Sequence, residues 1–247
     1  MIAKEEKDIK GLKAAGNVCA RALKLMMDSA KPGMTTLELD NIGEDFLSTE
    51  GARSAPRAMY NFPGGTCISI TPVIAHGIPG DHVIKEGELI NIDVSAELGG
   101  YFGDTGASMV VGKSKPEYDK LLEATKSTLA KVLSLVQAGK PLNIIGKTVQ
   151  QEAAKHGYNP IFDLTGHGIG LQLHEKPSAV YNFHKPDDRR LLEEGLVLAI
   201  EPFLTTGKGH VVEKSDGWSL KTVDNTIAAQ FEHTVIITKG EPIILTV

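Results

Sequence analysis

Glu88-Leu-Ile-Asn-Ile-Asp-Val-Ser95 is the stretch of this 247-residue chain that decides the fold. Its apolar residues alternate with polar ones, which is the two-residue period of a β-strand with one buried face. We therefore expect the isoleucines to enter a core, while Asn91 and Asp93 lie on the opposite face. The pair Gly99-Gly100 is typical of a hairpin turn. A second acid, Asp104, follows eleven residues after Asp93, so one hairpin carries two carboxylates.

Three further polar residues lie in comparable surroundings. Glu201 ends the apolar run 196–200, Glu232 interrupts the segment 230–237, and His167 is surrounded by glycines. Carboxylates in apolar strands are costly unless they are paired, protonated or bound to metal. Each acid taken singly is also compatible with a helix cap or a salt bridge. Taken together, four acids and one imidazole carry too many like charges for one cavity without cations. We predict one metal site formed by Asp93, Asp104, His167, Glu201 and Glu232.

The ligand types restrict the metal. Oxygen-rich ligation with one imidazole suits manganese, iron or cobalt better than it suits a thiolate-rich structural zinc site, although zinc also accepts these ligands. Carboxylates can bridge, so five side chains can hold two divalent ions about 3.5–4 Å apart with a water molecule between them. Such a pair lowers the pKa of the water and polarises a carbonyl group, which is the chemistry of hydrolysis.

Two more histidines are candidates for the site. His76 lies in an Ala-His-Gly-Ile-Pro motif, and His174 follows His167 by seven residues. The glycines around His167 allow a close backbone approach and leave the imidazole accessible. His233 directly follows Glu232, so on a strand its side chain points to the other face. We interpret the remaining histidines as ordinary surface or core residues.

Composition bounds the function class. The chain is 41% apolar and 23% charged, with a net charge of −5, as expected of a globular protein without a basic surface for nucleic acid. The sequence contains no run of 18 uninterrupted apolar residues, so it predicts no membrane-spanning helix. Two cysteines, Cys19 and Cys67, form no disulfide framework, and no signal peptide is recognisable. We therefore expect a reducing cytoplasm.

Helix signals divide the chain. Residues 4–30 have the apolar spacing of an amphipathic helix. Capping boxes at 35–38 and at 114–117 predict the starts of two further helices. The helix that starts at 35–38 is expected to end near residue 51. Apolar residues at helical spacing continue to Val136 in the last of these helices.

A faint repeat relates residues 20–52 to residues 120–158. In both segments a helix is followed by a glycine turn and by a second helix that ends in glycine, and the offset is 106 residues. Two unrelated helix pairs with common turn chemistry are the alternative interpretation. We predict one catalytic domain over residues 1–247, with halves at roughly 1–112 and 113–247.

Several sequence blocks carry a specific resemblance. They are Ala-His-Gly-Ile-Pro, Asn-Ile-Asp-Val with Gly-Asp-Thr-Gly, Thr-Gly-His-Gly-Ile-Gly with His-Glu-Lys-Pro, Ala-Ile-Glu-Pro-Phe, Gly-Trp-Ser-Leu-Lys-Thr and Gln-Phe-Glu-His-Thr. In this order, over essentially the whole chain, the blocks resemble a type I methionine aminopeptidase of the bacterial kind, in metallopeptidase family M24. The resemblance implies an α/β (α+β) "pita-bread" fold, in which two pseudo-symmetric halves of antiparallel sheet are covered by helices.

The resemblance also implies roles for the metal ligands. Asp93 corresponds to the bidentate ligand of one ion, and Asp104 and Glu232 correspond to the carboxylates that bridge both ions. His167 and Glu201 complete the second site. All five positions carry the residue type that the family requires.

Three residues receive catalytic roles from the same resemblance. Glu201 corresponds to the general base for the water between the metals. His76 would contact the scissile amide nitrogen and assist protonation of the leaving group. His174 would hydrogen-bond to the substrate carbonyl oxygen and stabilise the oxyanion.

The methionine pocket matches less closely. Phe62, Cys67 and Trp218 stand where the resemblance places the lining of a small apolar slot. Met59 and Leu173 stand where many relatives have aromatic residues, and Leu173 is expected to widen the slot slightly. Ordinary core packing is the alternative for Met59 and Phe62, and Cys67 is either a packing residue or an oxidation-sensitive thiol.

The resemblance implies an enzyme that removes the initiator methionine from nascent proteins and prefers a small second residue. It also implies contact with the ribosome near the exit tunnel, and we expect a monomer. An X-Pro dipeptidase or aminopeptidase of the same fold is an alternative, against which Gly217-Trp218 and the short N-terminal region count. A non-catalytic binding protein on this scaffold is a second alternative, but such a protein is expected to lack ligands that this chain retains.

Overall fold

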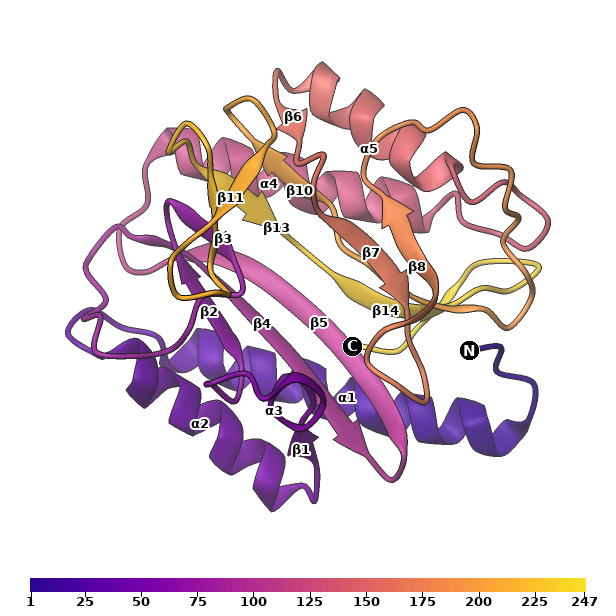
Figure 1. Ribbon diagram of the computed structural model, residues 1–247, viewed down its shortest axis with the longest axis horizontal. Helices are drawn as coiled ribbons and strands as arrows, with labels where there is room; N and C mark the ends of the chain where they lie inside the picture. Colours follow the sequence, from indigo (N-terminus) through magenta and orange to yellow (C-terminus); the bar gives the residue numbers. More distant parts are fainter.

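Helices and antiparallel strands alternate through the computed structural model, which describes residues 1–247. The helices are α1 (Glu6–Ser29), α2 (Thr36–Thr49), α3 (Ala55–Tyr60), α4 (Pro116–Leu133) and α5 (Ile144–Lys155). The strands are β1 (Arg53–Ser54), β2 (Cys67–Ile70), β3 (Val73–Ala75), β4 (Leu89–Leu98), β5 (Tyr101–Val110), β6 (Asn159–Pro160), β7 (Thr165–Gly168), β8 (Glu175–Tyr181), β9 (Val197–Ile200), β10 (Phe203–Thr205), β11 (Val211–Glu213), β12 (Leu220–Thr222), β13 (Ala228–Gln230), β14 (His233–Ile236) and β15 (Ile243–Ile244). Figure 1 shows α1 and α2 on one side of the molecule and α4 and α5 on the other, with the strands between them. The predicted mixed fold of antiparallel sheet covered by helices is confirmed.

The predicted hairpin is the longest strand pair. Strands β4 and β5 run antiparallel with one continuous register, from Leu89 opposite Val110 to Leu98 opposite Tyr101. The apolar residues of β4 at positions 90, 92 and 94 are completely buried and pack in one cluster with residues of α1 and α2. The alternation predicted from Glu88-Ser95 is therefore confirmed, with the isoleucines facing the helices.

The predicted helix starts are right in one case and wrong in another. Thr35 caps α2, and the side chain of Glu38 accepts the Thr35 N–H at 2.7 Å, which confirms that capping box. At α4 the N-cap is Lys115, which makes no side-chain cap, and Pro116 occupies the first turn. The capping box predicted from Ser114 is wrong, because the Ser114 hydroxyl lies at 3.4 Å from the carbonyl oxygen of Lys115 and no helix N–H reaches it.

The two helix pairs share their turn chemistry. Gly33 and Gly139 follow α1 and α4 with φ values of 90° and 87°, and Gly51 and Gly157 follow α2 and α5 with 74° and 76°. Positive φ at the end of a helix is nearly free of strain for glycine alone. Helix α4 ends at Leu133, short of the predicted Val136. The division of the chain into two related halves stays a prediction, and these matched glycines are the observation that supports it.

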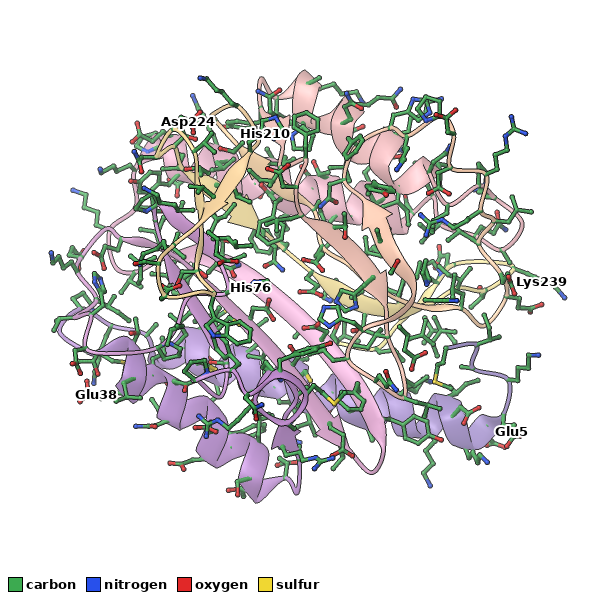
Figure 2. All side chains as sticks on the ribbon, in the orientation of Figure 1. Glu5, Glu38, His76, His210, Asp224 and Lys239 are labelled. Carbon is green, nitrogen blue, oxygen red and sulfur yellow. The ribbon has the colours of Figure 1, made fainter.

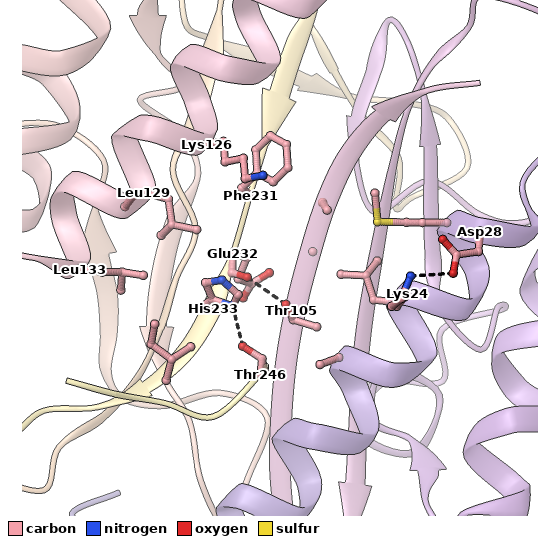
Figure 3. Close-up of a pocket in the computed structure, with 17 residues that line it drawn as sticks. Lys24, Asp28, Thr105, Lys126, Leu129, Leu133, Phe231, Glu232, His233 and Thr246 are labelled. Atoms are coloured by element: carbon pink, nitrogen blue, oxygen red, sulfur yellow. Dashed lines mark hydrogen bonds and ion pairs between the residues drawn. The ribbon is translucent and has the colours of Figure 1, made fainter. Parts of the chain in front are cut away.

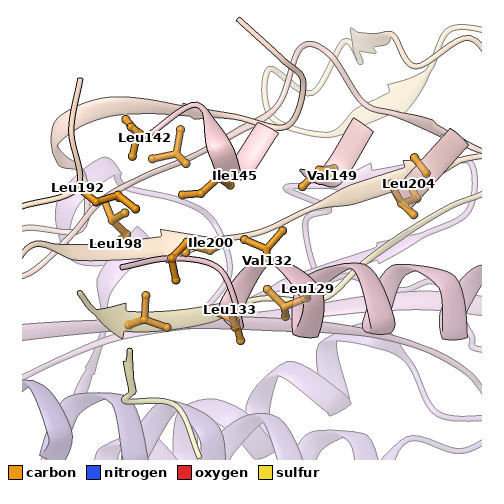
Figure 4. Close-up of a cluster of buried hydrophobic side chains, with 14 of the residues drawn as sticks. Leu129, Val132, Leu133, Leu142, Ile145, Val149, Leu192, Leu198, Ile200 and Leu204 are labelled. Atoms are coloured by element: carbon orange, nitrogen blue, oxygen red, sulfur yellow. The ribbon is translucent and has the colours of Figure 1, made fainter. Parts of the chain in front are cut away.

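The second half has its own core. Strands β15, β14, β9, β7 and β8 form a five-stranded sheet in that order, and β13, β10 and β6 form a three-stranded sheet. Figure 4 shows the apolar cluster that joins these strands to α4 and α5. Its members include Leu129, Val132, Leu133, Ile145, Val149, Leu198, Ile200 and Leu204.

Strand β5 connects the two halves. The Glu232 N–H donates to the carbonyl of Gly106 at 2.9 Å, the Thr105 hydroxyl donates to the carbonyl of Glu232 at 2.9 Å, and an isolated bridge pairs Ala107 with Phe231. The hairpin of the first half therefore lies directly beside the strands that carry ligands of the second half. No helix has the length and apolarity needed to cross a membrane.

Candidate metal centre

Two acids come from the β4–β5 hairpin. Asp93 pairs with Gly106, and Asp104 pairs with Ser95, so the acids lie two residues apart along the ladder. An offset of two keeps both side chains on the same face of the sheet. Asp104 is buried, with 6% of its surface exposed, and Asp93 is half-buried. The predicted proximity of the first two acids therefore follows from the register of one hairpin.

Two further acids lie opposite each other at a break in a longer ribbon. Strand β9 pairs with β14 up to Ile200 and His233, and pairing resumes between β10 and β13 at Phe203 and Gln230. Two residues of each segment lie in this gap and pair with nothing in the ribbon. Glu201 is one of them in the first segment, and Glu232 is one in the second. The interruption frees both carboxylates from the alternation of a regular strand and lets them turn toward the hairpin.

His167 joins the two pairs of acids. Its Nε2 lies 3.5 Å from Oδ2 of Asp104 and 3.7 Å from Oε1 of Glu201. The other nitrogen, Nδ1, lies 3.0 Å from the carbonyl oxygen of Gly168. A carbonyl can only accept, so Nδ1 is assigned as the donor, and a neutral imidazole then presents the Nε2 lone pair to the acids. This is the tautomer of a metal-ligating histidine.

The electrostatics of the cluster reflect crowding. Burial, and then the charge of Asp104, raise the pKa values of Asp93, Glu201 and Glu232 well above those of ordinary carboxyl groups. Burial alone would lower the pKa of His167, but the hydrogen bond and charge of Asp104 outweigh it and raise that pKa. The site is short of positive charge, because one imidazole faces four carboxyl groups.

Two carboxylate oxygens without hydrogen-bond partners indicate where a cation would bind. Oδ1 of Asp104 and Oε1 of Glu232 are buried and have no hydrogen-bond partner. Ligand atoms of Asp104, His167 and Glu232 all lie within 4.8 Å of one another. Buried polar atoms are nearly always partnered in folded proteins, and two carboxylates with an imidazole are suitable ligands for a divalent cation. These residues therefore fit a metal ion.

Of the two additional candidate histidines, His174 contacts this cluster, and His76 lies near enough for the charge of Asp104 to act on its pKa. His76 follows β3 with φ 52°, a left-handed conformation that is uncommon for a residue with a side chain, and Figure 2 shows it near the middle of the molecule. The ring centroid of His174 is 4.1 Å from that of His167. Burial, and then the charge of His167, lower the pKa of His174 to about 4. His233 instead shares a hydrogen bond with Thr246 at 2.8 Å, away from the ligands as predicted.

Among the predicted pocket residues, Phe62 and Cys67 are buried near the predicted site, whereas Met59 and Leu173 have other surroundings. Phe62 is buried and packs edge-to-face against Trp218, with 5.2 Å between ring centroids. Cys67 is buried and pairs with Asp93 across β2 and β4, and burial raises the pKa of its thiol well above the ordinary value. Met59 is 39% exposed, so it is not a core residue. Leu173 is buried in a different apolar cluster, with residues such as Phe102.

Sequence reasoning missed the residues that hold the ligands. The Gln230 side chain donates to Glu232 Oε2 at 2.9 Å and accepts from the Asn91 amide at 2.7 Å. Both amides lie two positions before a predicted ligand, Asn91 before Asp93 and Gln230 before Glu232. For Asn91 the signal is the offset of two, which places it on the same face of β4 as Asp93. Glu232 lies beyond the end of β13, so no strand period links it to Gln230.

The cavity drawn in Figure 3 lies between α1 and α4. It has a volume of about 600 Å³ and reaches Glu232 and His233 from the side covered by the helices. Lys24 and Asp28 of α1 form an ion pair of 2.8 Å at this cavity. His76, His167 and His174 do not line it, so the cavity reaches Glu232 from a side away from these histidines.

Comparison with known sequences agrees with the geometry. Residues 10–239 match the model of metallopeptidase family M24. The chain is 46% identical over 247 residues to methionine aminopeptidase 2 of Bacillus subtilis, and the match covers 100% of this chain and 99% of that protein. The buried Asp, His and Glu group is therefore found in a metallopeptidase framework, which supports a divalent metal cofactor.

Solved structures give the same relationship. The structure superimposes on the crystal structure of methionine aminopeptidase from Rickettsia prowazekii with a TM-score of 0.95 and 36% identity, covering all of both chains. A prolidase from Pyrococcus horikoshii shares the fold, with a TM-score of 0.80 at 24% identity, but this chain covers only 63% of its length. The chain therefore belongs to metallopeptidase family M24, and the relatives described above that it matches over the full length of both chains are methionine aminopeptidases.

Proposed function

We propose that this protein is a metal-dependent aminopeptidase that hydrolytically removes the N-terminal methionine from polypeptide chains and prefers a small second residue. The observation that carries the proposal is the pair of buried, unpartnered oxygens on Asp104 and Glu232 beside Nε2 of His167. The full-length relatives from Bacillus subtilis and Rickettsia prowazekii are named methionine aminopeptidases, which supports this reaction over other hydrolyses. The prolidase-type alternative rests on likeness of fold alone and is not favoured.

Two divalent ions are the proposed cofactor, drawn from manganese, iron, cobalt or zinc. Asp93 would bind one ion, Asp104 and Glu232 would lie between both, and His167 and Glu201 would complete the second site. When bound, such ions polarise a carbonyl group and lower the pKa of a water molecule. The chain supplies four carboxyl groups and one imidazole for them, held in strands or directly beside strands.

Glu201 is the proposed general base. Its carboxylate lies within the cluster of predicted ligands, where it is placed to accept a proton from a water molecule held there. The carboxylate directly follows β9 and is 3.7 Å from the ring of His167. It would accept the proton of the attacking water and pass it to the departing amine.

The two additional candidate histidines are proposed to act on the peptide. His174 would donate a hydrogen bond to the carbonyl oxygen of the scissile bond and stabilise the developing negative charge. His76 would contact the amide nitrogen and assist its protonation. The left-handed backbone of His76 is consistent with this role, because strained conformations cluster at functional sites.

Phe62, Cys67 and Trp218 are proposed to line the slot for the methionine side chain. The edge-to-face contact between Phe62 and Trp218 would provide a rigid apolar wall. Met59 is exposed and would meet the substrate at the rim. Leu173 is buried, and its predicted effect of widening the slot slightly stays a prediction.

The proposed working place is the cytoplasm, where nascent chains are available near the ribosomal exit tunnel. The two free, buried cysteines, Cys19 and Cys67, are compatible with a reducing compartment. We propose that the protein acts as a monomer and recognises no nucleic-acid sequence of its own.

Release of free methionine from Met-Ala-Ser and Met-Leu-Ser tests the proposal. The purified protein is assayed after metal stripping and again with added manganese or cobalt. Cleavage of the alanine peptide alone, restored by metal, is the expected result. The variant Glu232→Gln should lose turnover, whereas Glu241→Gln, which changes an exposed glutamate, should retain it.

Two other outcomes are informative. Bound metal without methionine release would reject methionine as the substrate, and cleavage of Ala-Pro would then point to an X-Pro enzyme. Absence of metal binding, measured by elemental analysis after dialysis against manganese or cobalt, would favour a non-catalytic binding protein.

A further inference from the structure

Tyr60, the last residue of α3, contacts a histidine 114 residues further along the chain. The phenol oxygen lies 2.7 Å from Nδ1 of His174, and the ring centroids are 5.5 Å apart. We propose that Tyr60 is a positioning residue, which fixes the His174 imidazole in the tautomer that donates from Nε2 to the substrate carbonyl. The inference rests on the proposed function, since it concerns the donor to that carbonyl.

The direction of the hydrogen bond follows from the chemistry of the two groups. A phenol has a pKa of about 10 and keeps its proton at neutral pH, so the Tyr60 hydroxyl can donate. Nδ1 of His174 then accepts. A neutral imidazole that accepts at Nδ1 carries its hydrogen on Nε2. The tyrosine thereby prepares the second nitrogen as a hydrogen-bond donor before the substrate arrives.

His174 needs this support because its backbone gives little. The residue lies in the bend between β7 and β8, outside any strand. The contact with Tyr60 is the one hydrogen bond that the ring makes. On the other side the ring meets His167 at 4.1 Å between centroids, which limits its tilt but does not choose between its nitrogens.

Tyr60 is itself held by a fixed element. The Ser54 hydroxyl accepts the N–H of Arg57 at the start of α3, at 3.3 Å, and the Arg57 guanidinium lies 2.7 Å from Glu44 of α2. Asn61 ends the helix in a left-handed conformation with φ 57°. The short helix is thus joined to α2 by an ion pair, and the hydroxyl projects from a helix rather than from a loop, as positioning of a partner side chain favours.

The variant Tyr60→Phe removes the hydroxyl and keeps the ring. With Met-Ala-Ser we expect kcat to fall about tenfold, the effect of losing roughly 1.4 kcal/mol in the transition state, while KM changes by less than about twofold. Metal content should equal that of the wild type. The matched control is Tyr118→Phe, which removes the hydroxyl of a half-buried tyrosine on α4 and should leave kcat unchanged. An unchanged kcat in Tyr60→Phe, or a loss of metal, would overturn the proposal.

A double-mutant cycle tests whether Tyr60 acts through His174. In the His174→Ala background the second change, Tyr60→Phe, should have no further effect on kcat, because the group that it positions is gone. A full tenfold loss in that background would show that the tyrosine acts elsewhere and would reject the positioning role.

The tautomer itself gives a readout that does not depend on turnover. In zinc-loaded protein with ¹⁵N-labelled histidine, NMR should show His174 protonated on Nε2 and bare on Nδ1, and Tyr60→Phe should shift this signal toward a mixture of tautomers. An identical tautomer in both proteins overturns the inference. If the wild type releases no methionine, the proposed function fails, and the nitrogen shifts still decide the role of Tyr60.

Discussion

Thr234 and Asp104 exchange two hydrogen bonds between β14 and β5. The Thr234 hydroxyl donates to the carbonyl of Asp104 at 2.7 Å, and the Asp104 N–H donates to the hydroxyl oxygen of Thr234 at 3.0 Å. The threonine is completely buried. A single hydroxyl therefore satisfies both backbone groups of Asp104, a predicted bridging ligand. The hydroxyl comes from β14, the strand that directly follows Glu232, which is the second predicted bridging ligand.

The variant Thr234→Val should disturb both stability and metal binding. It retains the shape of the side chain but leaves the two backbone groups of Asp104 unpaired in the interior. We expect a loss of roughly 1–3 kcal/mol in the free energy of unfolding and weaker metal binding, measured by urea denaturation and by calorimetric titration with manganese. Thr49→Val, on the exposed side of α2, should stay within about 0.5 kcal/mol of the wild type. Equal stability of both variants would contradict the prediction.

Replacing Gln230 should weaken metal binding, although its side chain is not itself a predicted ligand. Its amide connects Glu232 to Asn91, so Gln230→Leu leaves one oxygen of Glu232 without its donor. Loss of such an outer partner typically lowers metal affinity about 10–100-fold. The dissociation constant for manganese measures this effect. Gln151→Leu, which changes an exposed residue of α5, is the control, and similar affinities in the two variants would exclude the role.

Asp40 should affect substrate binding more than turnover. This buried carboxylate on α2 accepts the N–H groups of Gly65 at 2.9 Å and Thr66 at 2.7 Å, and the Thr66 hydroxyl at 2.6 Å. These bonds fix the loop between Phe62 and Cys67. In Asp40→Asn one oxygen becomes a donor that faces the donor of Gly65.

For Asp40→Asn we expect KM for Met-Ala-Ser to rise several-fold with kcat nearly unchanged, and a stability loss of roughly 1–3 kcal/mol. Steady-state kinetics and denaturation measure the two effects. Asp45→Asn, on an exposed position of the same helix, should change neither quantity. A fall in kcat at constant KM would show that this loop serves the reacting groups instead of the pocket.

Asp216 should make the loop of Trp218 sensitive to acid. Burial alone would raise the pKa of this carboxyl group, but the N–H groups of Trp218 and Ser219, at 3.0 and 2.8 Å, outweigh it and lower the pKa to about 2. A pKa below the unfolded value of 3.8 means that the ionised form stabilises the folded state. The contribution is complete above about pH 4 and is lost as the pH falls toward 2.

The variant Asp216→Asn should therefore unfold at a lower temperature than the wild type at pH 6, and the difference should shrink between pH 4 and pH 2. Thermal unfolding across this range, followed by tryptophan fluorescence, measures both points. Asp187→Asn, an exposed residue without a side-chain hydrogen bond, is the control. A difference that is independent of pH would mean that the charge of Asp216 has no part in holding the loop.

The local elements of the fold could be predicted from the sequence because their signals are local. The alternation around Asp93 predicts β4, the glycine pair at 99–100 predicts its turn, and Thr35 predicts the start of α2. Ser114 failed as a cap because the same residue pattern is compatible with a start one position later, where Lys115 leads into Pro116.

The cluster of acids could also be predicted, because buried carboxylates without cations are too unfavourable to be left scattered. Its supports could not. Tyr60 reaches His174, and Thr234 reaches Asp104, over 114 and 130 residues. Such contacts depend on the twist and register of whole sheets and on a helix of six residues, which is too short to show a period.

The predicted metal ligands and the residues proposed to face the substrate lie in different kinds of element. The four predicted acids and the imidazole lie in strands or directly beside them, whereas Tyr60, Phe62 and His174 lie on α3 or in connecting loops. Substitutions in α3 and in the loops can therefore change the range of accepted peptides without changing the metal ligands. The same separation bears on inhibitors. A compound that only chelates the metal is bound by the ligand set alone, whereas one that extends to α3 also meets Tyr60 and the loops beside it.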